Sequence, residues 1–117
     1  MSQDSCIFCK IATGQIPSPR VHEDSDFFVI RDIQPQARVH LLVIPKKHYP
    51  SLADIPGAEA ASVHSGILAA AVEAARKEGI LESGFRSFIN TREHGGQTVH
   101  HLHLHVLGGA PVSGRFA

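Results

Sequence analysis

The sequence predicts an α+β fold: a five-stranded antiparallel sheet with one long helix and a short N-terminal helix. Five short extended segments follow one another with mostly short links, which favours antiparallel pairing. Between the third and fourth of them lies an alanine-rich stretch with apolar residues at helical spacing. The chain has 117 residues, so we expect residues 1–117 to form a single domain around one modest core.

The elements are expected in a fixed order along the chain. They are a short helix at 6–13, an extended segment at 20–23, strands at 27–31 and 39–44, a long helix at 58–78, and strands at 85–90 and 99–107. Val63, Ile67, Ala71 and Ala74 form the apolar stripe of the long helix, and Gly79 suits its C-terminal cap. Residues 50–57 and 91–96 are expected to be loops.

Histidine is the unusual component of this sequence, with nine residues, four of which fall within positions 100–105. In the last predicted strand, His101, His103 and His105 alternate with apolar residues, so they are expected on one face of the sheet. Three crowded imidazoles cannot all be charged near neutral pH. Such a cluster is costly unless it binds a metal or an anion, or shares protons.

Three interpretations of the cluster follow from the residues. The histidines could simply face solvent, they could ligate zinc, or one of them could act as a nucleophile toward phosphorus. The neighbouring residues favour phosphate chemistry, because Gly95 and Gly96 let backbone N–H groups approach an anion closely. Side-chain donors at Gln97, Thr98 and Asn90 are expected near the same place.

Charge and hydropathy exclude several classes of protein. Eleven basic residues balance eleven acidic ones, so the basic surplus of a nucleic-acid-binding protein is missing. No apolar run approaches the roughly 20 residues that span a bilayer, and the first residues do not resemble a signal peptide. We therefore expect a cytoplasmic protein with neither a nucleic-acid nor a membrane partner. No organic cofactor is expected.

A Cys-x-x-Cys motif is formed by Cys6 and Cys9, the only cysteines of the chain. In a reducing compartment this spacing indicates metal ligation or redox chemistry rather than a structural disulfide. Two reduced, buried thiols are the alternative.

The sequence of residues 99–107 resembles the His-φ-His-φ-His-φ-φ signature (φ apolar) of the histidine triad superfamily. The similarity extends to residues 6–11, 32–37, 40–48 and 95–98, and the Hint branch of nucleotide-binding proteins is closest in kind. The resemblance implies an α+β homodimer with sheets joined across the interface. It also implies binding of a purine nucleoside monophosphate (AMP or GMP) and hydrolysis of nucleoside phosphoramidates and aminoacyl-adenylates.

The same resemblance assigns catalytic roles to residues of this chain. His103 matches the nucleophile that forms a nucleotidyl-histidine, and His105 matches a phosphate ligand. His101 and His40 match histidines that tune and relay protons, and Thr98 stands near the leaving group.

Binding roles are implied in the same way. Asp32 matches the carboxylate that accepts from the ribose hydroxyls, and Phe8, Ile11 and Ile33 match parts of the base pocket. A turn-capping role is the alternative for Asp32, and ordinary core packing is the alternative for the apolar residues. In zinc-bearing members the four ligands correspond here to Cys6, Cys9, His48 and His101, which suit a structural zinc ion.

Departures from the family pattern leave substrate selectivity open. They are His100 in place of an aromatic residue, Arg31 before Asp32, and a tail without tryptophan. Besides a phosphoramidate or adenylate hydrolase, three other functions fit the sequence. They are a nucleotide-binding regulatory module with incidental hydrolysis, a dinucleoside polyphosphate hydrolase, and a zinc enzyme that uses the triad as ligands.

Overall fold

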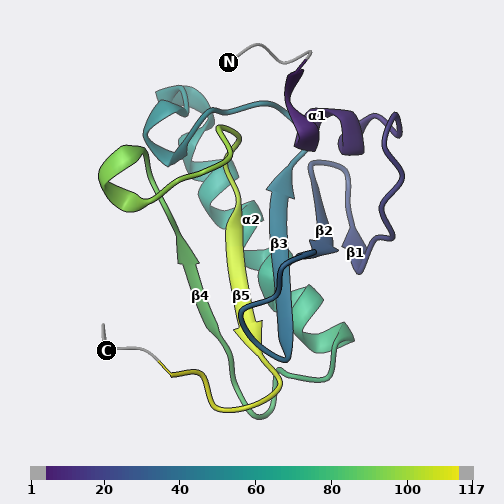
Figure 1. The fold of residues 1–117 in the computed structure, drawn as a ribbon. Coiled ribbons are helices and arrows are strands. Elements are labelled where there is room, and N and C mark those ends of the chain that lie inside the picture. Colours follow the sequence, from purple (N-terminus) through teal and green to yellow (C-terminus); the bar gives the residue numbers. More distant parts are fainter. Residues whose placement is uncertain (1–4, 114–117) are drawn as a thin grey trace.

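The computed structural model describes residues 5–113, and its strands form one antiparallel sheet, as predicted (Figure 1). In chain order the elements are α1 (Ile7–Ala12), β1 (His22–Glu23), β2 (Phe27–Arg31), β3 (Val39–Pro45), the 3-10 helix η2 (Leu52–Asp54), α2 (Gly57–Lys77), β4 (Arg86–Ile89), the 3-10 helix η3 (Glu93–Gly95) and β5 (Leu104–Gly108). The order of the strands across the sheet is β1-β2-β3-β5-β4. The last strand in sequence therefore lies between β3 and β4.

The two faces of the sheet are covered unequally. Strands β2 and β3 are buried on both faces, which explains their continuous apolar sequences. Val29 and Val43 pair across the sheet and belong to the main core under α2, whereas Phe28 and Ile44 belong to a second core under α1. On the face of α1, the second core ends at β3, so β5 and β4 lie outside it.

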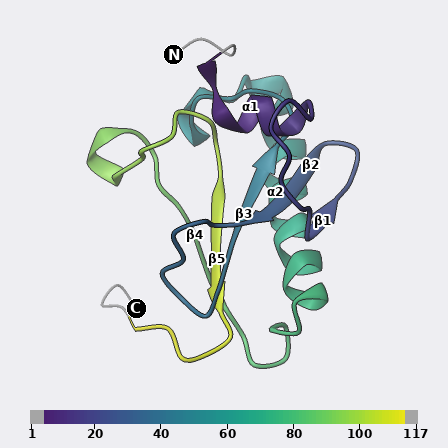
Figure 2. The same ribbon diagram turned by 45° about the vertical axis from the view of Figure 1, so that its right-hand side comes forward.

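The long helix α2 lies close against the sheet (Figures 1 and 2). A Cβ atom on Gly66, in the middle of this helix, would lie 2.4 Å from Cε2 of Phe27. Only glycine permits this approach, although glycine inside a helix costs roughly 1 kcal/mol relative to alanine. No helix among residues 5–113 has the length and hydropathy needed to cross a bilayer.

The last strand starts later than predicted. It begins at Leu104 rather than at residue 99, so His101 and His103 precede it. The final pair with β3 is Val43↔Leu104, and Pro45, which ends β3, has no N–H to continue the ladder. The predicted alternation nevertheless persists, because Leu102 and Leu104 both enter the main core.

Candidate active site and metal centre

The three histidines of residues 101–105 lie on the α1 side of the sheet, at the border of the second core. His101 and His103 are buried, and both contact the edge or face of Phe8 from α1, with ring centroids 5.7 and 5.3 Å apart. His105 is half-buried and lies beside His103, with ring centroids 5.0 Å apart. The sequence therefore predicted correctly that the three imidazoles share one side of the chain.

One ring nitrogen of His103 is tied to the backbone and the other is free. Nδ1 lies 2.8 Å from the carbonyl oxygen of His101, and a carbonyl can only accept, so Nδ1 carries the proton. Nε2 then holds a lone pair. Every fully buried side-chain nitrogen or oxygen of residues 5–113 has a hydrogen-bond partner, whereas this Nε2 has none, so it reaches solvent. His103 thus presents an unprotonated nitrogen to the open side of the sheet.

His105 is held in the opposite tautomer by a chain of hydrogen bonds. The backbone N–H of Gln36 donates to Nδ1 of His40 over 3.0 Å, which leaves the His40 proton on Nε2. That nitrogen lies 2.9 Å from Nδ1 of His105 and 3.4 Å from Oδ2 of Asp32. Nδ1 of His105 therefore accepts, and its proton sits on Nε2. The His103 ring, which has a free lone pair, therefore lies beside the His105 ring, which has a free N–H.

Burial keeps this cluster neutral. Desolvation lowers the pKa of His103. Desolvation, followed by the neighbouring His103 and His40, lowers the pKa of His105 to about 4. The prediction that these imidazoles are not all charged near neutral pH agrees with these shifts.

A second cluster occupies the N-terminal end of the same segment. The donor atoms of Cys6, Cys9, His48 and His101 all lie within 4.8 Å of one another. Nδ1 of His101 lies 3.2 Å from Sγ of Cys6 and 3.1 Å from Nδ1 of His48, which in turn lies 3.3 Å from Sγ of Cys9. The four residues that the resemblance implied as metal ligands are brought together.

The chemistry of this donor set fits zinc. Zn–N bonds of about 2.0–2.1 Å and Zn–S bonds of about 2.3 Å place neighbouring donors roughly 3.3–3.8 Å apart in a tetrahedron, close to the distances above. Nε2 of His101 donates to the carbonyl of Pro45 over 2.8 Å, so its Nδ1 lone pair faces the cluster. Burial and then the adjacent Cys6 thiol raise the pKa of Cys9 to about 11, so two thiolates here require a cation between them.

Gln97 has a different task from the one predicted. We expected its side chain to donate to a substrate, but its amide donates to the carbonyls of Pro50 and Val99 over 2.7 and 3.0 Å. Its Oε1 accepts from the backbone N–H of Arg92 over 2.8 Å. The Gln97 side chain therefore stabilises the loop at residues 91–96 by hydrogen bonds to backbone groups. Thr98 is exposed and Asn90 is half-buried, and their side chains make no hydrogen bond within residues 5–113.

This loop contains a strained residue that sequence reasoning missed. Arg92 has φ 58° and ψ −166°, a backbone conformation that costs a non-glycine residue about 1–3 kcal/mol. Its guanidinium donates to Oδ1 of Asp54 over 2.9 Å, which links the loop to η2. Asp54 also accepts from the Ser51 hydroxyl. No sequence pattern marks this contact, because its two partners are 38 positions apart.

The remaining predicted binding residues differ in their surroundings. Asp32 uses Oδ1 to accept from the backbone N–H of Gln34, so it does cap the turn, while Oδ2 faces His40. Phe8 and Ile11 are buried in the second core, and Ile33 is 92 % exposed. Phe88 was not predicted, yet its ring stacks on His105 with centroids 4.6 Å apart and planes 12° from parallel.

Comparisons with known proteins agree with this geometry. Residues 5–115 match the family described as scavenger mRNA decapping enzyme C-term binding. The purine nucleoside phosphoramidase of Escherichia coli (strain K12) is 41 % identical over 109 residues, which cover 93 % of this chain and 91 % of the relative.

Solved structures share the fold as well. A histidine triad protein from Clostridium difficile superposes with a TM-score of 0.92 at 43 % identity, covering 98 % of this chain and 99 % of the other. The chain belongs to the histidine triad superfamily. A zinc-bound histidine triad family protein from Mycobacterium smegmatis is 38 % identical, with a TM-score of 0.75 over 92 % of this chain and 76 % of the other. The chain is therefore a hydrolase of the histidine triad type.

Proposed function

We propose that this histidine triad protein hydrolyses purine nucleoside phosphoramidates and aminoacyl-adenylates and releases a nucleoside monophosphate. One observation carries the proposal: the His103 ring, whose Nε2 is free and unprotonated, lies beside the His105 ring with centroids 5.0 Å apart, and hydrogen bonds fix both tautomers. A neutral imidazole nitrogen is a good nucleophile toward phosphorus, and a neighbouring N–H stabilises the charge that develops on a phosphoryl oxygen. The phosphoramidase activity of the Escherichia coli relative supports the substrate class.

The reaction has two steps. In the first, Nε2 of His103 forms a bond to the α-phosphorus while the bond from phosphorus to the leaving group breaks. A leaving amine takes a proton from solvent, relayed by the exposed Thr98 hydroxyl, whereas an aminoacyl-adenylate releases its amino acid as a carboxylate that needs no proton. The His103 ring becomes positively charged, and the carbonyl of His101 stabilises that charge through Nδ1–H. In the second step, water attacks phosphorus, the P–Nε2 bond breaks, and the water proton leaves through solvent.

The nucleoside is held by the remaining predicted residues. Oδ2 of Asp32 accepts from the ribose hydroxyls, and the His40–His105 pair carries the phosphate donor. The purine packs against Ile33, whose side chain is exposed, at the edge formed by Phe8 and Ile11. Asn90 contributes a free amide near His105.

A structural zinc ion joins α1 to the histidine segment through Cys6, Cys9, His48 and His101. The Cys₂His₂ donor set and its spacing support this assignment. Bound zinc would supply a fixed positive charge that keeps both thiols ionised. Among residues 5–113, His103 belongs to neither group of potential metal ligands, which disfavours a zinc enzyme that uses the whole triad.

The active protein is a homodimer in this proposal. Within the described residues, β4 pairs only with β5, so its outer edge is open. Leu68 and Val72 on α2 and Phe88 on β4 are exposed apolar side chains. Sedimentation at micromolar concentration should give twice the chain mass, and a monomer would contradict this part of the proposal.

The experiment that tests the function follows a single covalent intermediate. Adenosine 5′-phosphoramidate should release AMP, and protein denatured at alkaline pH, where the bond from phosphorus to histidine survives, should carry one adenylyl group. His103→Asn should remove the adduct and lower kcat about 10³-fold or more, with nucleotide binding retained. His64→Asn, an exposed histidine on α2, is the matched control and should behave as wild type.

Different results would favour the rival functions. Release of AMP without a His103 adduct would contradict the mechanism. Binding of AMP with no turnover of phosphoramidates or adenylates would favour a regulatory module, and faster turnover of diadenosine polyphosphates would favour the polyphosphate hydrolase.

A further inference from the structure

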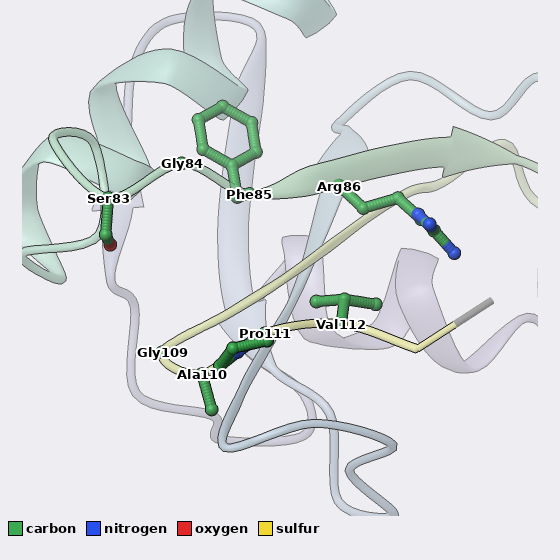
Figure 3. Close-up of a pocket in the computed structure, with 8 residues that line it drawn as sticks. All are labelled: Ser83, Gly84, Phe85, Arg86, Gly109, Ala110, Pro111 and Val112. Carbon is green, nitrogen blue, oxygen red and sulfur yellow. The ribbon is translucent and has the colours of Figure 1, made fainter. Parts of the chain in front are cut away.

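The hollow shown in Figure 3 lacks the groups that a reactive site needs. It has a volume of about 520 Å³ and lies between the start of β4 and the segment 109–112. Arg86 is the only ionisable side chain of its lining, and a guanidinium is neither a base nor a nucleophile in proteins. A cluster of ionisable side chains that the proposed reaction does not use lies instead at the opposite edge of the sheet, where β1 is the outermost strand.

Asp24, His22 and Lys77 form a chain of hydrogen bonds from β1 to the last residue of α2. Nε2 of His22 lies 3.3 Å from Oδ2 of Asp24, and an ionised carboxylate can only accept, so Nε2 carries the proton. Nδ1 of His22 then holds a lone pair, which accepts from Nζ of Lys77 over 2.9 Å. The amino group of Lys77 therefore faces a base that a carboxylate orients.

The backbone fixes the base of this chain and leaves the amine accessible. Strand β1 packs against α2, which brings His22 to the end of the helix. Oδ1 of Asp24 accepts from the backbone N–H groups of Asp26 and Phe27 over 3.0 and 2.8 Å, so the carboxylate is held in the turn that follows β1. The side chain of His22 is only 12 % exposed, whereas Lys77 is exposed. A reagent in solution can therefore reach the amine without displacing the base.

The other lysines of the described chain lack such a partner. Lys46 and Lys47 each form an ion pair with a glutamate, over 2.9 and 2.7 Å, and a carboxylate stabilises the protonated, unreactive amine. The side chain of Lys10 makes no hydrogen bond or ion pair within residues 5–113. Lys77 is the lysine of this set whose amine contacts an imidazole.

The carboxylates near Lys77 in the sequence are engaged elsewhere. Glu73, one turn earlier on α2, pairs with Arg76 over 3.3 Å, and Glu78 pairs with Arg31 over 2.8 Å. Within residues 5–113, His22 is therefore the only side-chain partner of Lys77. An imidazole with a free lone pair can accept the proton that an amine loses when it attacks a carbonyl carbon.

We propose that Lys77 is an acylation site, at which His22, oriented by Asp24, is the base for attack on activated acyl groups (acyl phosphates or acyl thioesters). Lys77 attacks as the free amine, after its additional proton has left to solvent. The nitrogen forms a bond to the carbonyl carbon, the bond from that carbon to phosphate or thiolate breaks, and Nδ1 of His22 takes the proton that the nitrogen loses. His22 then returns this proton to solvent or to the leaving group, and an amide remains on Lys77. The inference goes beyond the proposed function and does not depend on it.

Acetyl phosphate is the probe for this site. Peptide mass spectrometry at several times gives the rate of acetylation at each lysine, and the quantity to compare is the rate at Lys77 divided by the rate at Lys10. Lys10 serves as an internal reference, because it meets the same reagent on the same chain. The ratio should be about tenfold higher in folded wild type than in protein unfolded by urea, where no base is positioned beside either amine.

Replacement of the base separates its role from simple exposure of the lysine. His22→Gln should lower the ratio about tenfold, because Lys77 stays exposed but loses the proton acceptor. Asp24→Asn keeps the Oδ1 acceptor of the turn and removes the acceptor for Nε2–H of His22, so the ratio should fall a few-fold. His64→Gln, on the exposed side of α2, is the matched control and should leave the ratio unchanged. Thermal melting of each variant checks that it is folded.

A second acyl donor identifies the kind of reagent that the site takes. The acetyl thioester of N-acetylcysteamine carries the same acyl group, and the donor with the larger fall of the ratio in His22→Gln is the preferred class. Neither donor is a nucleotide, so His103→Asn should give the wild-type ratio whether or not the protein hydrolyses phosphoramidates. With both donors, equal ratios in folded and unfolded wild type would overturn the site. A high ratio that His22→Gln does not lower would overturn it as well.

Discussion

The two ends of the histidine segment use the same side chain in opposite ways. At His101 the backbone holds Nε2, so Nδ1 is presented to two thiols and a second imidazole. At His103 the backbone holds Nδ1, so Nε2 is presented to the open face of the sheet. The residues are only two positions apart, and each accepting group is a main-chain carbonyl.

This contrast teaches that the tautomer, rather than the residue type, decides what a histidine can do. One end has soft, converging donors and is suited to a structural cation. The other end has a ring with a free lone pair beside a ring with a free N–H, and this pair is suited to attack on phosphorus. The following predictions test whether the two ends are separate in function.

Removal of the thiols should produce the largest change in stability. Wild-type protein should contain about one zinc ion per chain, and Cys6→Ser/Cys9→Ser should contain none. Because zinc binding here contributes to folding, we expect a loss of several kcal/mol, or a fall in Tm of about 10 °C or more. Activity should fall less, about tenfold, since the proposed nucleophile His103 is unchanged. Metal analysis, calorimetry and turnover check this.

Chelated wild-type protein is the control for the serine substitutions. It should lose stability to the same extent and regain it when zinc is added. Metal-free wild type that takes up no zinc and melts at the same temperature would mean that the two cysteines are ordinary reduced thiols.

Replacement of His105, the proposed phosphate donor, should affect the reaction at His103 but not the Cys₂His₂ cluster. His105→Asn removes the Nε2–H beside His103, and loss of one such donor typically lowers kcat about 10²-fold. Zinc content should not change, because His105 is not in the Cys₂His₂ cluster. If the variant lost zinc as well, the two ends would be coupled and the contrast drawn above would be wrong.

Because the pKa of His105 is lower in the folded than in the unfolded protein, the stability should depend on pH in the acid range. The pKa of His105 is lowered to about 4 in the folded protein, mainly by burial, from an ordinary value near 6.5. Between these values the unfolded chain binds a proton that the folded chain does not, so the free energy of unfolding falls as pH falls from about 6.5 to 4. The slope of the free energy of unfolding against pH, measured by denaturant unfolding, should be steeper for wild type than for His105→Asn. The difference should correspond to a fraction of a bound proton. The exposed His94→Asn is the control, and equal slopes in wild type and His105→Asn would contradict the effect.

The smallest effect is expected in the strained loop. Arg92→Gly relieves the backbone strain but removes the ion pair with Asp54, so stability should change by less than about 1 kcal/mol. Activity should fall a few-fold, because the loop that ends at Thr98 is no longer tied to η2. Asp54→Asn is the matched variant, which keeps the strain and weakens the pair. A gain in activity of Arg92→Gly would show that the contact does not position the loop.

Patterns of neighbouring residues predicted most of the fold. Strands β2 and β3 were predicted within one residue, and α2 was expected at 58–78 and observed at Gly57–Lys77. Continuous apolar runs and the helical stripe are local signals, so sequence suffices for them. The start of β5 was missed because it depends on where β3 ends, at Pro45, and that is a property of the pairing.

The sequence indicated the four potential metal ligands that the structure brings together, but it did not indicate the hydrogen bonds around them. The Cys-x-x-Cys spacing and the alternating histidines are visible in the sequence, and the structure brings the four potential ligands together. Which nitrogen of His101 or His103 is free depends on carbonyls whose positions no motif encodes. The internal role of Gln97 and the ion pair of Arg92 both arise from contacts between distant segments.

The bond that orients the His103 ring has a genetic consequence. Its acceptor is the peptide carbonyl of His101, which every amino acid supplies, so no single codon change can delete it. Substitution of residue 101 by all other amino acids would therefore report only on the loss of its side chain. The hydrogen bond to His103 would be tested only by replacing the peptide amide that contains this carbonyl with an ester. A lineage could therefore lose the His101 side chain by drift and still keep the His103 ring oriented by the same carbonyl.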